Sequence, residues 1–349
     1  MRTIKVQTGR PYDILIERGL IDRCGQFIKE VSKAQKVCVV TDSNVEKIYA
    51  QRVIDSIKEQ GFETKLFVFE AGEERKRLST ISDMYGYFAD FHMSRKDLVV
   101  ALGGGVTGDM AGFAAASYMR GIEFVQIPTS LLAQVDSSVG GKTGVDIEQG
   151  KNLVGAFWQP NRVIIDPDTL KTLPQHFIND GMAEVIKYGC IKDSKLFDIL
   201  KNENALDIIE DIIEICVSIK RDVVNADERE KGERMLLNFG HTLGHSLEKI
   251  YNYSGLSHGE AVAIGMCIIT AASEKAGITK TGTTEEIISL CKKYGLPTTD
   301  NASPKEIAEI CSSDKKSSGG SVNLVLLKEI GTSFTQPTRL DELENFITL

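Results

Sequence analysis

The chain has 349 residues, enough for two domains with a sizeable hydrophobic core. Its content of 42% hydrophobic and 26% charged residues is ordinary for a globular protein. The formal net charge of −8 argues against a general nucleic-acid-binding protein, and an anionic ligand would need a locally basic site.

Short β-rich segments alternate with helical patterns in the first half of the chain. The predicted strands are 37–41, 64–69, 98–102, 124–127 and 162–165, and the predicted helices run from about residue 44 and over 78–90. The segment 98–102 is apolar throughout, as expected of a strand that is buried on both faces. This alternation predicts an α/β fold with a mostly parallel, doubly wound sheet.

The second half of the chain, from about Thr172 to Lys316, has the pattern of helices and few strand signals. Apolar residues at three- and four-residue spacing predict helices over 205–224, 238–251 and 259–276. A β-like run at 321–327 and a short helix close the sequence.

The boundary between these halves is predicted in the proline-punctuated stretch 167–174. We therefore expect an α/β domain over 1–172 and an all-α domain over 173–349. A cleft between two domains is the usual place for a ligand.

Cysteine use and hydropathy predict a soluble, cytoplasmic protein. The seven cysteines are an odd number without C-x-x-C spacing, which favours free thiols in a reducing compartment. The N-terminal segment 1–6 alternates like a strand and lacks the apolar run of a signal peptide. The apolar stretch 261–272 is too short to span a bilayer, and the longer region 98–119 is glycine-rich and holds Asp109.

A glycine-rich turn follows the predicted strand 98–102. Gly103, Gly104 and Gly105 would let the backbone approach a pyrophosphate, and a helix predicted to begin near Thr107 would offer free N–H groups. The spacing is not G-x-G-x-x-G, so a plain strand-to-helix turn is an alternative interpretation.

Two polar residues, Asp42 and Asn44, come directly after the predicted strand 37–41. They could bind ribose hydroxyls, as acidic residues do in dinucleotide-binding folds, or simply cap the following helix.

A second glycine-rich stretch, 136–144, is followed by Gly150-Lys151-Asn152. It is not a nucleotide-hydrolase phosphate loop, because G-x-x-x-x-G-K-[ST] would need a glycine at Asp136. A polar loop that carries Lys142 and Lys151 would suit an anionic small molecule. A surface loop without a ligand is the alternative.

Histidines and a carboxylate form a candidate metal site. His241 and His245 are four residues apart and so share a helix face, His258 precedes another predicted helix, and Glu184 lies in a third. Two histidines and one carboxylate, with positions left open, suit catalytic Zn²⁺. The spacing is not H-E-x-x-H, which argues against a metalloprotease. Histidines hydrogen-bonded in a helical core are the alternative.

Basic residues are spread among these motifs: Arg120, Lys142, Lys151, Lys187, Lys220, Arg234, Lys315 and Lys316. If several converge, they would create the basic site that a phosphorylated carboxylic acid needs in an acidic protein. Otherwise they are solvated surface charges.

Taken together, these motifs resemble those of the 3-dehydroquinate synthase family. The matching runs occur in family order and are 102–109, 128–131, 136–144, 150–160, 183–188, 227–230, 237–245 and 258–262. No single run is specific, but the set covers most of the chain. The resemblance implies a Rossmann-like NAD-binding domain over 1–172, a helical metal- and substrate-binding domain over 173–349, and a homodimer.

The resemblance also implies roles for individual residues. Zn²⁺ or Co²⁺ would be held by Glu184, His241 and His258. NAD would contact Asp42, Asn44, Glu73, Lys76, Gly104, Gly105, Asp109, Thr129, Ser130, Lys142, Lys151, Thr169, Leu170, Lys171 and Thr172. The substrate would contact Arg120, Asp136, Lys142, Asn152, Lys187, Lys220, Arg234, Asn238, His245 and one of Lys315 and Lys316.

The implied reaction converts 3-deoxy-D-arabino-heptulosonate 7-phosphate into 3-dehydroquinate and phosphate. It combines NAD-dependent oxidation, phosphate elimination, reduction and an intramolecular aldol closure, with no net use of NAD. Three alternatives stay open: a related cyclase whose substrate lacks the carboxylate, such as a 2-deoxy-scyllo-inosose synthase-like enzyme; a metal-dependent alcohol or glycerol dehydrogenase; and a non-catalytic binding protein. No nucleic-acid or membrane partner is expected.

Overall fold

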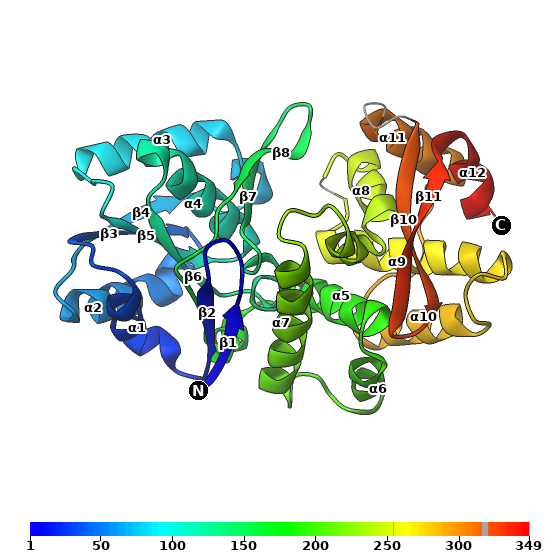
Figure 1. Ribbon diagram of the computed structural model, residues 1–349, viewed down its shortest axis with the longest axis horizontal. Coiled ribbons are helices and arrows are strands. Elements are labelled where there is room, and N and C mark those ends of the chain that lie inside the picture. The colour runs from blue at the N-terminus through cyan, green and yellow to red at the C-terminus, as the bar shows by residue number, and fades with distance from the viewer. Residues whose placement is uncertain (254, 316–319, 349) are drawn as a thin grey trace. The chain divides into compact units, whose positions relative to one another are not determined.

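The computed structural model of the chain describes residues 1–253, 255–315 and 320–348. The chain forms two compact units (Figure 1). The first consists of Met1–Pro174 with Lys220–Arg229, and the second of Gln175–Ile219 with Glu230–Leu349. The sequence pattern assigned all of 173–349 to one domain, whereas the structure groups 220–229 with the first unit.

A seven-stranded sheet organises the first unit, in the order β1-β2-β9-β6-β5-β3-β4. The strands are β1 (Arg2–Val6), β2 (Tyr12–Ile16), β3 (Lys36–Asp42), β4 (Glu63–Phe69), β5 (Leu98–Gly103), β6 (Glu123–Pro128) and β9 (Arg162–Ile165). Only β1 pairs antiparallel, with β2, and the other neighbours in the sheet are parallel. The predicted α/β fold is confirmed.

Helices cover both faces of this sheet (Figure 1). They are α1 (Cys24–Val31), α2 (Gln51–Glu59), α3 (Leu78–Asp90) and α4 (Gly105–Ser117). Because successive side chains of a strand point to opposite faces, Val39 of β3 packs in the core with α1 and α2, whereas Val40 packs in the core with α3 and α4. The short helical turns of this unit are 20–23, 46–50, 73–75, 118–120, 133–137 and 167–172.

The end of the glycine-rich stretch 136–144 and the segment 150–152 belong to a β-hairpin, where the sequence had predicted a loop. Strands β7 (Lys142–Ile147) and β8 (Gly150–Phe157) pair antiparallel, and Gly144 lies opposite Gly155. A Cβ on Gly155 would overlap the carbonyl oxygen of Thr143. The glycines therefore allow two strands to approach closely, and Lys151 lies in a strand. The helix after β5 also begins earlier than predicted, at Gly105.

The second unit is built mainly from helices. They are α5 (Gln175–Ile191), α6 (Ser194–Asn202), the first part of α7 (Ile209–Ala226), a short turn at 233–238, α8 (His241–Ile250), α9 (His258–Lys275), α10 (Thr283–Lys293), α11 (Pro304–Lys315) and α12 (Leu340–Thr348). Most residues of helix α9 are buried, and a capping box of Ser257 and Glu260 starts the helix. The predicted helical character is confirmed.

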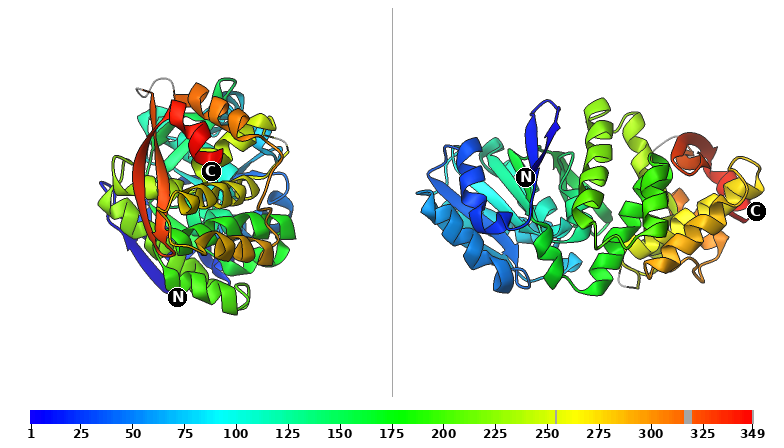
Figure 2. Two further views of the ribbon diagram at one scale, coloured as in Figure 1. Left: turned by 90° about the vertical axis from the view of Figure 1, so that its right-hand side faces the viewer. Right: turned by 90° about the horizontal axis from the view of Figure 1, so that it is seen from below.

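One hairpin departs from the all-α expectation for this unit. The predicted strand 321–327 lies within β10 (Ser321–Glu329), which pairs antiparallel with β11 (Thr332–Arg339). Figure 2 shows this hairpin as a long ribbon beside the helices. The sequence did not predict β11, because it is mostly polar and contains Pro337.

All seven cysteines are buried, and none of them forms a disulfide. Burial raises the pKa of Cys24 and of Cys38 to about 12, which disfavours their thiolates. Within the described ranges, no helix has the length and apolar character that crossing a membrane requires.

The hydrogen bonds of the Asp97 carboxylate connect separate segments of the first unit, and their contribution to stability can be tested. Its Oδ1 accepts hydrogen bonds from the backbone N–H groups of Gln35 and Lys36, and its Oδ2 accepts from the N–H and hydroxyl of Ser94. Burial raises the pKa of Asp97, but these donors outweigh it and hold the pKa below the usual 3.8. We expect Asp97→Asn to lower the free energy of unfolding by about 1–3 kcal/mol at neutral pH, because an amide cannot accept at both positions.

The difference between the parent and Asp97→Asn should depend on pH. A carboxyl with a depressed pKa in the fold stabilises above its unfolded pKa and loses that contribution as the pH falls through the folded value. The two denaturation curves should therefore converge below about pH 4. Equal stability at neutral pH would contradict this account.

Candidate functional site

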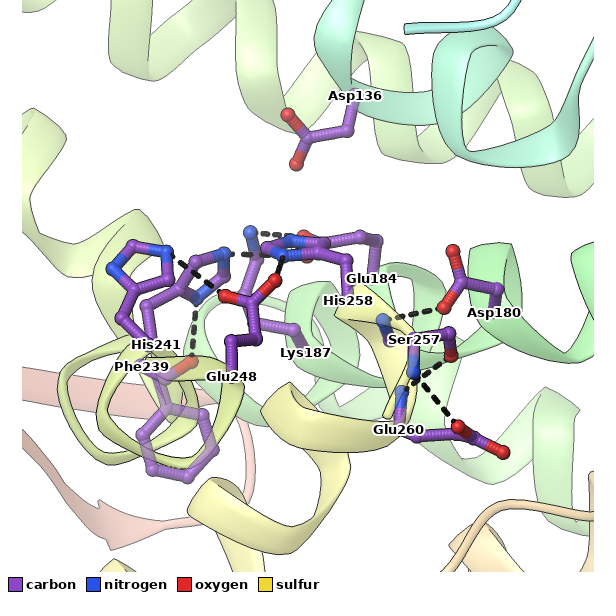
Figure 3. A network of polar contacts seen from close by, with 12 residues as sticks. Asp136, Asp180, Glu184, Lys187, Phe239, His241, Glu248, Ser257, His258 and Glu260 are labelled. Atoms are coloured by element: carbon purple, nitrogen blue, oxygen red, sulfur yellow. Dashed lines mark hydrogen bonds and ion pairs between the residues drawn. The ribbon is translucent and has the colours of Figure 1, made fainter. Parts of the chain in front are cut away.

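Three helices of the second unit bring the predicted metal ligands together (Figure 3). Glu184 lies in α5, His241 is the first residue of α8 and His258 is the first residue of α9. One ligand atom from each lies within 4.8 Å of the others. The sequence therefore predicted residues that the fold places side by side, although their assignment as ligands stays a prediction.

Small residues allow these helices to approach so closely. A Cβ on Gly265 of α9 would overlap the carbonyl oxygen of Gly240, which precedes α8. A Cβ on Gly259 would overlap the backbone of Asp180 in α5. The starts of α8 and α9 can therefore meet at Glu184.

The geometry of the two imidazoles presents their Nε2 atoms to one carboxylate oxygen. The Nε2 atoms of His241 and His258 each lie 3.3 Å from Oε1 of Glu184. The Nδ1 of His241 lies 3.1 Å from the carbonyl oxygen of Phe239. A carbonyl only accepts, so we assign the proton of neutral His241 to Nδ1, and its Nε2 keeps a lone pair for a cation.

Glu184 is a buried charge that lies beside a lysine and two imidazoles. Only 1% of its surface is exposed, and Lys187, one turn along α5, forms an ion pair with its Oε2. Burial raises the pKa of Glu184, but Lys187 and His241 outweigh it and hold the pKa well below its usual value.

The pKa of His258 moves the other way. Burial lowers it, but the carboxylates of Glu184 and Glu248 outweigh burial and raise the pKa to about 10. A cation would thus compete with protons for this site. Two imidazole nitrogens and one carboxylate oxygen fit a divalent ion such as Zn²⁺.

His245 lies beside this cluster in α8. Its side chain is largely exposed, and its Nε2 is 4.0 Å from Oε2 of Glu248. His245, Glu248 and His258 form a second group whose ligand atoms lie within 4.8 Å. Sequence reasoning missed Glu248. The one available signal was its position three residues after His245, and that spacing does not distinguish it from a solvated helix glutamate.

Two other predicted substrate residues of this unit lie just before α8. Arg234 is 1% exposed in the turn 233–238, and Asn238 donates from Nδ2 to Oε1 of Glu230 at 3.0 Å. Lys316 and the side chain of Lys315 lie outside the described residues.

In the first unit, several predicted NAD and substrate residues gather around Lys76. Its Nζ lies 2.6 Å from Oδ2 of Asp109 and 2.7 Å from Oδ1 of Asn152. Lys151 pairs with Glu73 at 3.6 Å. Burial lowers the pKa of Lys76, but Asp109 and Glu73 outweigh it and raise the pKa, so this buried lysine is charged.

The predicted NAD residues at the carboxyl ends of the parallel strands also lie near one another. Gly104 and Gly105 follow β5, while Thr129 and Ser130 follow β6. The Thr129 N–H donates to the carbonyl of Gly103 at 3.0 Å, and a Cβ on Gly104 would meet the Ser130 hydroxyl at 3.3 Å. This edge of a parallel sheet is where nucleotides bind in doubly wound folds.

Asp42 is the last residue of β3, at the same edge of the sheet. Its Oδ1 accepts from the N–H groups of Asn44 and Val45, which form the turn before the helical segment 46–50, and among the described residues no side-chain hydrogen bond caps that segment. A ribose contact remains a prediction.

The remaining predicted residues of this unit are more dispersed. Thr169, Leu170, Lys171 and Thr172 lie in the turn 167–172, where exposed Lys171 pairs with Asp168. Lys220 forms an ion pair with Asp136 and donates to its carbonyl at 2.7 Å. Arg120 and Lys142 are exposed, and Arg120 has φ 67°.

The assignment of Glu184, His241 and His258 as metal ligands can be tested directly. We expect His241→Ala to weaken Co²⁺ binding by about 100-fold or more, because one of the three ligands is lost and outer partners alone are worth 10–100-fold. His176→Ala is the control, since His176 is exposed and lies outside the cluster. Titration followed by cobalt absorption measures both, and equal affinities would contradict the assignment.

Comparison with known proteins identifies the family. Models of the N-terminal and C-terminal regions of 3-dehydroquinate synthase match residues 66–180 and 181–317. The chain is 49% identical to 3-dehydroquinate synthase of Clostridium acetobutylicum, over 99% of both chains. It is 50% identical to that of Clostridium perfringens, over 99% of this chain and 100% of the relative.

A solved structure shows the same fold. It is 2-deoxy-scyllo-inosose synthase in complex with carbaglucose-6-phosphate, NAD⁺ and Co²⁺, with a TM-score of 0.88, 24% identity and 99% of each chain covered. Near-complete coverage by relatives that are about half identical decides the assignment. The chain belongs to the 3-dehydroquinate synthase family.

Proposed function

We propose that the chain converts 3-deoxy-D-arabino-heptulosonate 7-phosphate into 3-dehydroquinate and phosphate. It thereby serves the shikimate pathway, which leads to the aromatic amino acids. The observation that carries this proposal is the 49% identity to a curated 3-dehydroquinate synthase, which extends over both units of the fold. The cluster of Glu184, His241 and His258 supports it, because the reaction needs a group that polarises hydroxyls.

Two cofactors belong to this proposal. Glu184, His241 and His258 hold Zn²⁺ or Co²⁺, which supplies Lewis acidity when bound. NAD supplies a hydride acceptor and donor, and it contacts the first unit through residues that include Lys76, Asp109 and Gly105. The complete set is Asp42, Asn44, Glu73, Lys76, Gly104, Gly105, Asp109, Thr129, Ser130, Lys142, Lys151 and 169–172.

The chain's own charges recognise the substrate. The proposed set is Arg120, Asp136, Lys142, Asn152, Lys187, Lys220, Arg234, Asn238 and His245. Arg234 and Lys187 are buried cations, and such groups pair strongly with phosphate and carboxylate oxygens once water is excluded. His245 is solvent-accessible, and an imidazole is a side chain that can transfer protons in catalysis.

A cyclase whose substrate lacks the carboxylate is the second candidate. The fold of 2-deoxy-scyllo-inosose synthase favours it, but that enzyme has only 24% identity to this chain. The curated 3-dehydroquinate synthases have about twice that identity, so the heptulosonate phosphate is the substrate that we propose.

Three further features belong to the proposal. The protein acts as a homodimer in the cytoplasm. The NAD-binding part covers 1–172, and the metal- and substrate-binding part covers 173–349.

The test measures phosphate, 3-dehydroquinate and NADH together. The metal-loaded protein receives the heptulosonate phosphate and a small amount of NAD⁺. We expect equal amounts of phosphate and 3-dehydroquinate, many turnovers per NAD⁺ and no accumulation of NADH. Absence of phosphate release, with metal and NAD bound, would refute the substrate. Net NADH formation from a simple polyol would instead indicate a dehydrogenase.

A variant pair tests the role of Lys187. Lys187→Met should lower kcat/KM by about 100-fold, as loss of one charge-stabilising donor typically does. Lys195→Met is the matched control, because Lys195 is exposed on α6. Unchanged kcat/KM in Lys187→Met would contradict the proposed contact.

A further inference from the structure

Glu248 is a buried carboxylate that the proposed ligand and substrate sets leave out. It lies on α8, seven residues after His241, and 3% of its surface is exposed. A carboxylate removed from water is costly unless charged or hydrogen-bonding groups face it. Its two oxygens face two histidines: Oε1 lies 3.8 Å from Nδ1 of His258, and Oε2 lies 4.0 Å from Nε2 of His245.

The imidazole of His258 lies between two carboxylates (Figure 3). Its Nε2 faces Glu184 at 3.3 Å and its Nδ1 faces Glu248. His241 has the same arrangement, with Nε2 toward Glu184 and Nδ1 toward the carbonyl oxygen of Phe239. Each imidazole thus presents one nitrogen to the cluster and holds the other beside an acceptor.

This arrangement differs between the two histidines in one respect. The acceptor for His241 is a backbone carbonyl, which the fold fixes, whereas the acceptor for His258 is a side chain. His258 begins α9, and its side chain is 33% exposed. An acceptor at Nδ1 selects the tautomer whose Nε2 has a lone pair, and it limits rotation of the ring.

We propose that Glu248 is a positioning residue for the metal site. It fixes the tautomer and orientation of His258 through Oε1, and it holds His245 beside the site through Oε2. The part that concerns His258 rests only on the cluster of three ligands. The part that concerns His245 rests on the proposed function, because it matters only if His245 meets the substrate.

The experiment uses the full chain and Co²⁺ as the probe. Glu248→Leu removes the acceptor, whereas Glu248→Gln keeps an amide oxygen that can still accept from Nδ1. We expect Glu248→Leu to weaken Co²⁺ affinity by about 10–100-fold, the usual loss for an outer carboxylate partner, and Glu248→Gln to weaken it by less than about 10-fold. Competition with a chromophoric chelator measures affinity, and the cobalt absorption bands of the loaded protein report ligand geometry.

The matched control is Glu274→Gln. Glu274 lies in α9 of the same unit, and its carboxylate accepts from the N–H groups of Gly282 and Thr284, away from the cluster. This change should lower the thermal stability without altering Co²⁺ affinity or absorption. If Glu248→Leu lowers stability but binds Co²⁺ with the parent's affinity and spectrum, the proposal is wrong.

Glu248→Ala keeps the test decisive if Glu248→Leu does not fold, because it also removes the acceptor. A folded Glu248→Ala with weaker Co²⁺ binding and an altered cobalt spectrum supports the proposal, and one with the parent's spectrum and affinity overturns it. The readout needs no turnover. A parent protein that binds Co²⁺ but releases no phosphate would overturn the proposed function and leave the positioning of His258 intact.

Discussion

The second unit depends on keeping one ionised carboxylate, that of Glu184, inside its helical core. An isolated buried charge would cost many kcal/mol, so positive or donor groups must converge on it. Lys187 supplies a charge from one turn along the same helix, and His241 and His258 supply imidazoles from two other helices. Small residues permit the close crossing of α8 and α9 that brings these imidazoles to Glu184. The two imidazoles that help to offset the cost of burying Glu184 are also the groups that could bind a cation beside it.

The first unit meets a similar electrostatic constraint with the opposite sign. Lys76 is buried, and carboxylate and amide oxygens from separate segments surround it. Asn152 contributes from the β7–β8 hairpin, where its φ is 55°. Asp109 contributes from α4, the helix that follows the glycine turn. The hairpin and the helix are thus linked through a single ammonium group, at the sheet edge where doubly wound folds bind nucleotides.

Local patterns in the sequence predicted much of this architecture. The helix over Leu78–Asp90 and the strand over Arg162–Ile165 were predicted with the bounds that the structure has, because helical periodicity and an apolar run are visible locally. The β7–β8 hairpin was missed, since glycine-rich polar sequence is also typical of loops. The grouping of 220–229 with the first unit depends on long-range packing that no local pattern records.

The candidate site was also predictable in part, because some of its residues stand at recognisable spacings in the sequence. Spacing along the chain indicated histidines near a carboxylate, but it left His241 and His245 equivalent. The family resemblance separated them, and in the structure only His241 approaches Glu184 together with His258. Glu248 was not predictable, because a helix glutamate is usually solvated and only tertiary packing buries this one.

The buried cysteines have a consequence for the chemical lifetime of the protein. A thiol reacts with oxidants and alkylating agents as its thiolate, and it must first meet the reagent. In the first unit, burial disfavours the thiolates of Cys24 and Cys38 and keeps reagents away from them. In the second unit, the helical core encloses Cys267 and Cys291. Modification at each position is therefore gated by transient local opening. The modification rate of each thiol therefore reports how often its own region of the fold opens.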